Sequence, residues 1–184
     1  MTAPRQAVRR TATEDRIVEI PGGGEVELGP LLPADQGALF GLFEEVVASG
    51  DGLPHEPPLT EEMFAATWLR PVTVTIAARL RAKGRKELAG AYYLKPSFVG
   101  RAAHIANAGY LVSSAHRRRG IGRRLVEDSL LRAPALGFDA IQFNLVFSSN
   151  PARVLYEELG WRAVGRLPAA VGGEDCLIYW REVG

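Results

Sequence analysis

The sequence predicts a single α+β domain whose core is a mixed sheet. Segments of β-branched and aromatic residues pair as hairpins, most clearly at residues 72–78 and 88–94. Residues 121–133 have the apolar spacing of a helix and lie between two strand-like segments, 103–112 and 139–147. Strands joined by a helical crossover run parallel, so this part is a βαβ unit. A chain of 184 residues can bury such a core without disulfides or metals.

The first third of the chain is expected to contribute a tail, a hairpin and a helix. Residues 1–14 carry arginines among small and polar residues without periodicity, which predicts a mobile N-terminal tail before a domain at residues 15–184. Residues 17–28 alternate around three successive glycines, as is typical of a hairpin. Across 34–48 the apolar residues recur at helical spacing, and Gly50 follows the expected end.

A proline-rich loop at residues 51–58 is followed by a short helix. Thr60 is its N-cap candidate, and the helix is expected to run to about Trp68. The last expected elements are a helix from Asn150 to Gly160 and two strands, 161–167 and 176–180, joined by a loop at 168–175.

Composition excludes several classes of protein. The chain is 47% hydrophobic with a formal net charge of +1, which disfavours general attraction to nucleic acid or membranes. The single cysteine, Cys176, excludes an intramolecular disulfide, and three scattered histidines make a zinc site improbable. No apolar run approaches the roughly 20 residues that span a bilayer. Without a signal-like segment, we expect a cytoplasmic protein that needs no metal.

Residues 116–125 place five arginines and two glycines at the start of the helix in the βαβ unit. The pair Gly120 and Gly122 allows a tight turn with bare N–H groups, and the helix adds the positive end of its dipole. These features suit an anion, most naturally a phosphate. The arginines could grip phosphates or form a solvated basic face.

Two blocks carry a resemblance to a known family. Residues 112–122 (Val-Ser-Ser-Ala-His-Arg-Arg-Arg-Gly-Ile-Gly) resemble the Val-x-Pro-x-x-(Arg/Gln)-x-x-Gly-x-(Gly/Ala) motif of the GNAT superfamily of acetyl-coenzyme A dependent N-acetyltransferases, with Ser114 in place of the frequent proline. Residues 150–161 (Asn-Pro-Ala-Arg-Val-Leu-Tyr-Glu-Glu-Leu-Gly-Trp) are similar to its Asn-x-x-Ala-x-x-Leu-Tyr-Glu-x-x-Gly-Phe segment. The resemblance covers residues 103–167 well and the N-terminal third only by element order.

The resemblance implies a mostly antiparallel twisted sheet, about four flanking helices, and two central parallel strands that splay to admit the pantetheine arm of acetyl-coenzyme A. Asn150 would contact this cosubstrate, and Tyr156 would lie near its sulfur as the acid for the departing thiolate. The alternative is that Tyr156 only packs its ring. The backbone of Leu111 and Val112 would pair with the arm, and the N–H groups of Arg117, Arg118, Arg119, Gly120, Ile121 and Gly122 would hold the pyrophosphate.

The acceptor side is less defined. Asn107 and Asn144 lie on the two strands expected to splay, where amides can bind a polar group of a small amino acid or its analogue. They could equally bridge a distorted sheet. His55 lies in the loop expected to cover the acceptor. The general base is not identifiable: water could carry the proton, and His55 and His104 are alternatives, although a hydrogen-bonded surface role suits each histidine.

The predicted function is transfer of an acetyl group from acetyl-coenzyme A to a primary or secondary amine of a small molecule in a ternary complex. The main alternative is a coenzyme A binding sensor without turnover, because no base is evident. An RNA-binding module using the arginine cluster is disfavoured by the near-neutral charge. A homodimer is left open.

Overall fold

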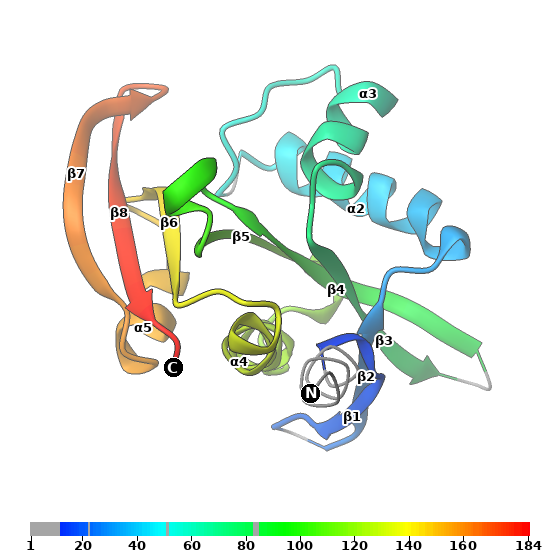
Figure 1. Ribbon diagram of the computed structural model, residues 1–184. Coiled ribbons are helices and arrows are strands. Elements are labelled where there is room, and N and C mark those ends of the chain that lie inside the picture. The colour runs from blue at the N-terminus through cyan, green and yellow to red at the C-terminus, as the bar shows by residue number, and fades with distance from the viewer. Residues whose placement is uncertain (1–11, 22, 51, 83–84) are drawn as a thin grey trace, which may run out of the picture.

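A computed structural model of the chain describes residues 12–21, 23–50, 52–82 and 85–184, and these residues form one mixed sheet. The sheet has eight strands in the spatial order β1-β2-β3-β4-β5-β6-β8-β7 (Figure 1). The strands are β1 (Arg16–Glu19), β2 (Glu25–Pro30), β3 (Val74–Ala82), β4 (Arg85–Pro96), β5 (Ile105–Val112), β6 (Ala140–Phe147), β7 (Arg162–Val171) and β8 (Glu174–Glu182).

Four α-helices flank the sheet within the described residues. They are α2 (Gln36–Ala48), α3 (Glu61–Phe64), α4 (Ile121–Ala135) and α5 (Ala152–Glu158), and the single π turn η2 (Ala65–Leu69) extends α3. The expected N-cap is confirmed, because the Thr60 side chain accepts a hydrogen bond from the Met63 N–H at 3.1 Å. No helix in this part of the chain is long and apolar enough to cross a membrane.

The one parallel pair of the described sheet separates soon after it begins. β5 and β6 are in register only from Ile105 opposite Ala140 to Asn107 opposite Gln142. β5 nevertheless stays paired with β4 as far as Val112. The expected splay between two parallel strands is therefore confirmed, and it leaves one edge of β5 unpaired with β6 beyond Asn107.

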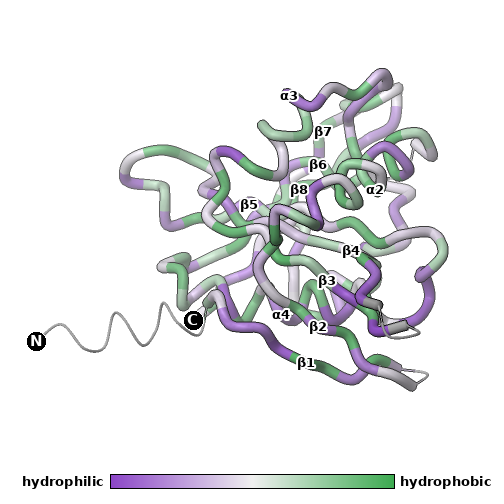
Figure 2. The backbone as a smooth tube through the Cα atoms, turned by 90° about the vertical axis from the view of Figure 1, so that its right-hand side faces the viewer, coloured by the Kyte–Doolittle hydropathy of each residue, from purple (hydrophilic) through white to green (hydrophobic). Residues whose placement is uncertain are grey.

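Two hydrophobic clusters lie on opposite faces of the sheet. Figure 1 shows α2 and α3 over one face and α4 and α5 over the other. Leu111 packs with α2 and Trp68, whereas Ala106 and Ala108 pack with α4 and α5. Along β1 the two apolar residues, Ile17 and Val18, lie between the charged Arg16 and Glu19 (Figure 2). The degree of burial nevertheless alternates from residue to residue, as the period-2 pleat requires. β5 thus contributes side chains to the clusters on both faces of the sheet.

The N-terminal segment differs from the expectation. Ala12 is fully buried, and the guanidinium of Arg132 donates to the carbonyls of Ala12 at 2.8 Å and Glu14 at 2.9 Å. The predicted tail is therefore wrong for residues 12–14, and residues 1–11 lie outside the described residues. The physical reason is on α4: Arg132 and its partner Asp128 are each 1% exposed, and a buried guanidinium needs several acceptors.

The end of the chain also differs. The expected loop at residues 168–175 is mostly strand, because β7 runs to Val171 and β8 begins at Glu174. Only Gly172 and Gly173 turn the chain, and both have positive φ, as a tight hairpin requires. The proline and alanines of this segment do not favour a strand, which is why a loop was expected. β7 lies at the edge of the sheet, where Pro168 is tolerated.

Candidate active site

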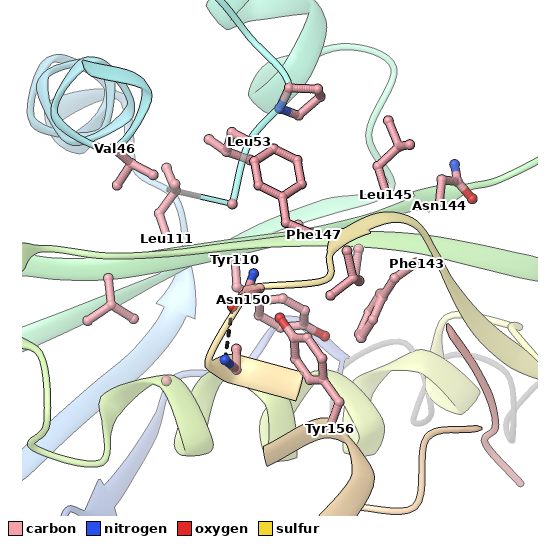
Figure 3. Close-up of a pocket in the computed structure, with 18 of the residues that line it drawn as sticks. Val46, Leu53, Tyr110, Leu111, Phe143, Asn144, Leu145, Phe147, Asn150 and Tyr156 are labelled. Carbon is pink, nitrogen blue, oxygen red and sulfur yellow. Dashed lines mark hydrogen bonds between the residues drawn. The ribbon is translucent and has the colours of Figure 1, made fainter. Parts of the chain in front are cut away.

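A cavity of about 530 Å³ lies where β5 and β6 separate. Figure 3 shows its lining side chains coming from α2, the loop after it, β5, β6 and α5. Leu53 and Leu111 face it from one side of the sheet and Tyr110 and Tyr156 from the other. The cavity therefore passes through the split in the sheet.

The N-terminus of α4 forms one end of this cavity. Gly120 is the N-cap with φ +83°, and Arg118 before it also has positive φ, so the backbone turns sharply into the helix. Arg117 and Gly122 line the cavity. The side chain of Ile121 points into the core, with 1% exposure. The turn and the first N–H groups of α4 have the form of an anion cradle.

Three further arginines of the cluster, Arg119, Arg123 and Arg124, have protein partners. Arg123 pairs with Glu158, and Arg124 donates to Glu127 at 2.8 Å and to the Glu19 carbonyl at 2.7 Å. Arg119 approaches His116, with 3.3 Å between Nη1 and Nδ1. Arg123 and Arg124 therefore connect α4 to α5 and to the first hairpin.

The first hairpin supports the cradle, a contact that could not be predicted from the sequence. A Cβ placed on Gly120 would lie 2.4 Å from Cδ of Pro21, so the ring of Pro21 packs directly on the turn. Ile20 beside it is buried, and the Glu19 carbonyl accepts from Arg124. A proline next to a glycine-rich segment does not indicate which distant residues it contacts, so the contact of Pro21 with the turn at Gly120 follows only from the structure.

Asn150 and Tyr156 both line the cavity at α5. Asn150 Oδ1 accepts from the N–H of Ala152, the first residue of α5, at 2.9 Å. This leaves the side-chain amide nitrogen facing Gly52, 3.2 Å from the position of an added Cβ. Tyr156 is 8% exposed and packs against Phe143, with ring centroids 4.7 Å apart (Figure 3). Burial, and secondly the nearby Tyr179, raise the pKa of Tyr156, so the phenol is protonated at neutral pH.

Asn107 stands where the two strands part. Its Oδ1 accepts from the Tyr93 hydroxyl at 3.1 Å, and its Nδ2 donates to the Gln142 carbonyl at 3.1 Å. The side chain thus replaces a ladder hydrogen bond at the end of the parallel pair. The ring of Tyr93 can cross β5 because Gly109 opposite has no Cβ, which would lie 2.6 Å from the ring. Of the two interpretations offered for this residue, the structural bridge is present.

Asn144 and His55 lie on the same cavity. Asn144 is exposed on β6 and accepts from Gln142 Nε2 at 3.0 Å, which leaves its amide N–H groups toward solvent. His55 packs edge-on against Phe43, with ring centroids 5.0 Å apart, and its Nε2 is 3.4 Å from the Thr67 hydroxyl. The structure therefore brings the three acceptor-side candidates to one cavity.

A sheet that splits beside a glycine-bearing helix N-terminus is the architecture of a GNAT-type acyltransferase. The chain belongs to the acetyltransferase (GNAT) family, whose model matches residues 45–161. A GCN5-related N-acetyltransferase from Kribbella flavida is similar in structure, with a TM-score of 0.78 at 30% identity, covering 85% of this chain and 97% of that one. A phosphinothricin acetyltransferase from Sinorhizobium meliloti in complex with acetyl-coenzyme A shares the fold, with a TM-score of 0.76 at 22% identity over 86% and 89% of the two chains.

Sequence relatives are similar over a shorter region. The N-acetyltransferase aca1 of Schizosaccharomyces pombe is 42% identical over 102 residues, which are 52% of this chain and 49% of aca1. Protein SPT10 of Saccharomyces cerevisiae is 36% identical over 86 residues, 46% of this chain and 13% of SPT10. The chain thus spans about half of one of these relatives and less of the other.

Proposed function

We propose that the protein transfers an acetyl group from acetyl-coenzyme A to a primary or secondary amine of a small molecule, with an amino acid or analogue favoured. The observation that carries this proposal is the course of the cavity. It leads from the cradle at Gly122, along the unpaired edge of β5, to amide and imidazole groups at Asn107 and His55. One end suits an anionic carrier, and the other suits a polar acceptor.

The residues present fit coenzyme A. The cradle can approach a pyrophosphate through backbone N–H groups, because Gly122 leaves room where a Cβ would meet nothing nearer than Val112 Cγ2 at 3.7 Å. Arg117 adds a positive charge on the cavity wall. Beyond Asn107 the backbone of Leu111 and Val112 is free of β6, so it can pair with an extended pantetheine amide as a further strand would.

When bound, acetyl-coenzyme A supplies an acyl group on a good leaving thiol. In the proposed reaction the amine nitrogen forms a bond to the acyl carbon, the carbon–sulfur bond breaks, and the sulfur takes a proton. Tyr156 can deliver that proton, because its phenol is protonated at neutral pH and reaches the cavity from α5. A backbone N–H at the end of β5 can stabilise the oxyanion.

A thiol-release assay tests the function. Purified protein is incubated with acetyl-coenzyme A and a panel of free amino acids, polyamines, aminoglycosides and peptide N-termini. We expect thiol release with at least one amino acid or analogue, and Tyr156→Phe should lower kcat by about 10²-fold or more while leaving the Kd for coenzyme A nearly unchanged. An unchanged kcat in this variant would remove the acid role. Thiol release with peptide N-termini alone would contradict the small-molecule acceptor.

A coenzyme A binding sensor is the second candidate, and one observation favours it. Among the described residues that line the cavity, Glu174 is the single carboxylate. Its pKa is lowered, chiefly because it accepts hydrogen bonds from the backbone N–H of Ser149 and the hydroxyl of Ser148, so it is a poor base. Coenzyme A binding without thiol release from any amine, unaltered in Tyr156→Phe, would support the sensor.

A further inference from the structure

We propose that His55 is the general base of the acetyl transfer, that Nδ1 is the atom that receives the proton, and that Thr67 fixes the tautomer. This inference rests on the proposed function, and it supplies the base that Glu174, the single carboxylate of the described cavity lining, does not.

The hydrogen bonds around Thr67 determine where the His55 proton resides. The Thr67 hydroxyl lies 2.8 Å from the Met63 carbonyl of the preceding turn and has a single proton, which it donates to that carbonyl. Its oxygen can therefore only accept at the contact with His55 Nε2, which is 3.4 Å away. The neutral imidazole then carries its proton on Nε2, and the lone pair is left on Nδ1.

Nδ1 of His55 is buried and has no hydrogen-bond partner among the described residues. Leaving a buried acceptor unpaired costs about 1–3 kcal/mol, so such an atom needs an explanation. The backbone two and three residues after His55 cannot donate to Nδ1, because Pro57 and Pro58 have no N–H. His55 lines the cavity although Nδ1 itself is covered, so a bound ammonium group that displaces the atoms over Nδ1 is the donor that would complete this site.

The surroundings keep the imidazole neutral. Desolvation, and secondly the charge of Lys95 on β4, lower the pKa of His55 below its ordinary value. The groups that contact the ring, Phe43 on α2 and Thr67 on η2, are uncharged. Tyr93 on β4 lines the same cavity and is also uncharged at neutral pH, because burial raises its pKa to about 12. Lys95 is held over the Tyr93 ring, 4.8 Å from its centroid. The base is therefore unprotonated at pH 7 and ready to accept.

The proton transfer balances simply. An N–H bond of the acceptor ammonium breaks, an Nδ1–H bond forms on the imidazole, and the electron pair stays on the amine nitrogen. The nitrogen is then a neutral nucleophile, and the imidazolium returns its proton to water after the product leaves. Lys95 assists this return, because a nearby positive charge disfavours the imidazolium.

The first test needs no activity. NMR of ¹⁵N-histidine-labelled protein should show His55 as the Nε2–H tautomer, titrating below the ordinary histidine range near 6.5. His104 is the matched control, because its Nδ1 lies 2.9 Å from the Arg101 carbonyl and must carry the proton when neutral. Signals are assigned with His55→Gln and His104→Gln. A proton on Nδ1 of neutral His55, or a pKa above 6.5, would overturn the proposal.

The second test uses the panel amine with the highest kcat/KM. His55→Gln, whose amide can still donate to Thr67, should lower kcat by about 10²–10⁴-fold, remove the acid limb of the pH profile and leave the Kd for coenzyme A unchanged. Imidazole should restore part of the rate to His55→Ala, and His104→Gln should behave as wild type. A parallel loss at every pH, without rescue, would mean a structural role and refute the base. If no amine releases thiol, both the proposed function and the role of His55 as its base are refuted. If the enzyme is active but His55 has the other tautomer, only the role of His55 as the base is refuted.

Discussion

The sequence motif and the structure give different reasons for a glycine at position 120. Replacing Gly120 tests which reason applies. From the motif alone, a side chain at Gly120 is expected to block the approach of a phosphate. In the structure the same side chain first meets the protein itself, because a Cβ would lie 2.4 Å from Cδ of Pro21. We therefore expect Gly120→Ala to destabilise the ligand-free protein.

The magnitude follows from two terms. Gly120 has φ +83°, and a left-handed conformation costs a residue with a Cβ about 1–2 kcal/mol. The contact with Pro21 adds the cost of overpacking, about 1–3 kcal/mol, because a proline ring in a hairpin cannot swing aside as a long side chain can. The expected loss of unfolding free energy is about 2–5 kcal/mol, or about 4–20 °C in Tm for a domain of this size.

Thermal and urea unfolding without coenzyme A measure this loss, and a double-mutant cycle assigns it. In the background Pro21→Ala, which removes the ring atom nearest to the added Cβ, Gly120→Ala should cost only the backbone term of about 1–2 kcal/mol. Equal costs in both backgrounds would refute the contact with Pro21. An unchanged Tm of the single variant would refute the whole argument and return Gly120 to a purely ligand-directed role.

Two further substitutions test the cradle and the buried ion pair. Gly122→Leu should raise the Kd for coenzyme A about tenfold or more, because the side chain would fill the cavity. Gly122→Ala is the control, because its Cβ would make only ordinary contact with Val112 at 3.7 Å. The Kd is measured by calorimetric titration, and equal affinities of the two variants would contradict a cradle there. Arg132→Met should cost about 3–5 kcal/mol in urea unfolding, because Asp128 at 1% exposure would keep only Arg16 as its ionic partner and the three backbone carbonyls that accept from Arg132 would lose their donor. A loss below about 1 kcal/mol would contradict this.

The fold could largely be predicted because its elements have local signatures. The helix at 121–133 and the strands on either side of it follow from periodicity, and the parallel pair follows from the crossover. The N-terminal segment could not be placed this way. Residues 12–14 are ordered by Arg132, which lies far along the chain, and an arginine in a helix normally indicates the solvent face.

The proposed cofactor half of the site was more predictable than the proposed acceptor half. The cradle is formed by residues that are contiguous in sequence, so the pair Gly120 and Gly122 is enough to predict it. The acceptor half is assembled from β4, β5 and the loop after α2, and its contacts join residues that are far apart. Tyr93 reaches Asn107 only because Gly109 lets its ring cross β5, a relation that depends on strand register. Register cannot be read from the sequence of one strand.

Asn107 connects these two halves, which explains why a polar residue stands at the centre of the sheet. An apolar side chain there would leave the Gln142 carbonyl and the Tyr93 hydroxyl unpaired in a region that is largely buried. By replacing one rung of the ladder with its own amide, Asn107 lets β6 leave β5 without an unsatisfied backbone group. Asn107 also lines the cavity together with His55, so the residue that ends the parallel pairing stands where the proposed acceptor half of the site begins.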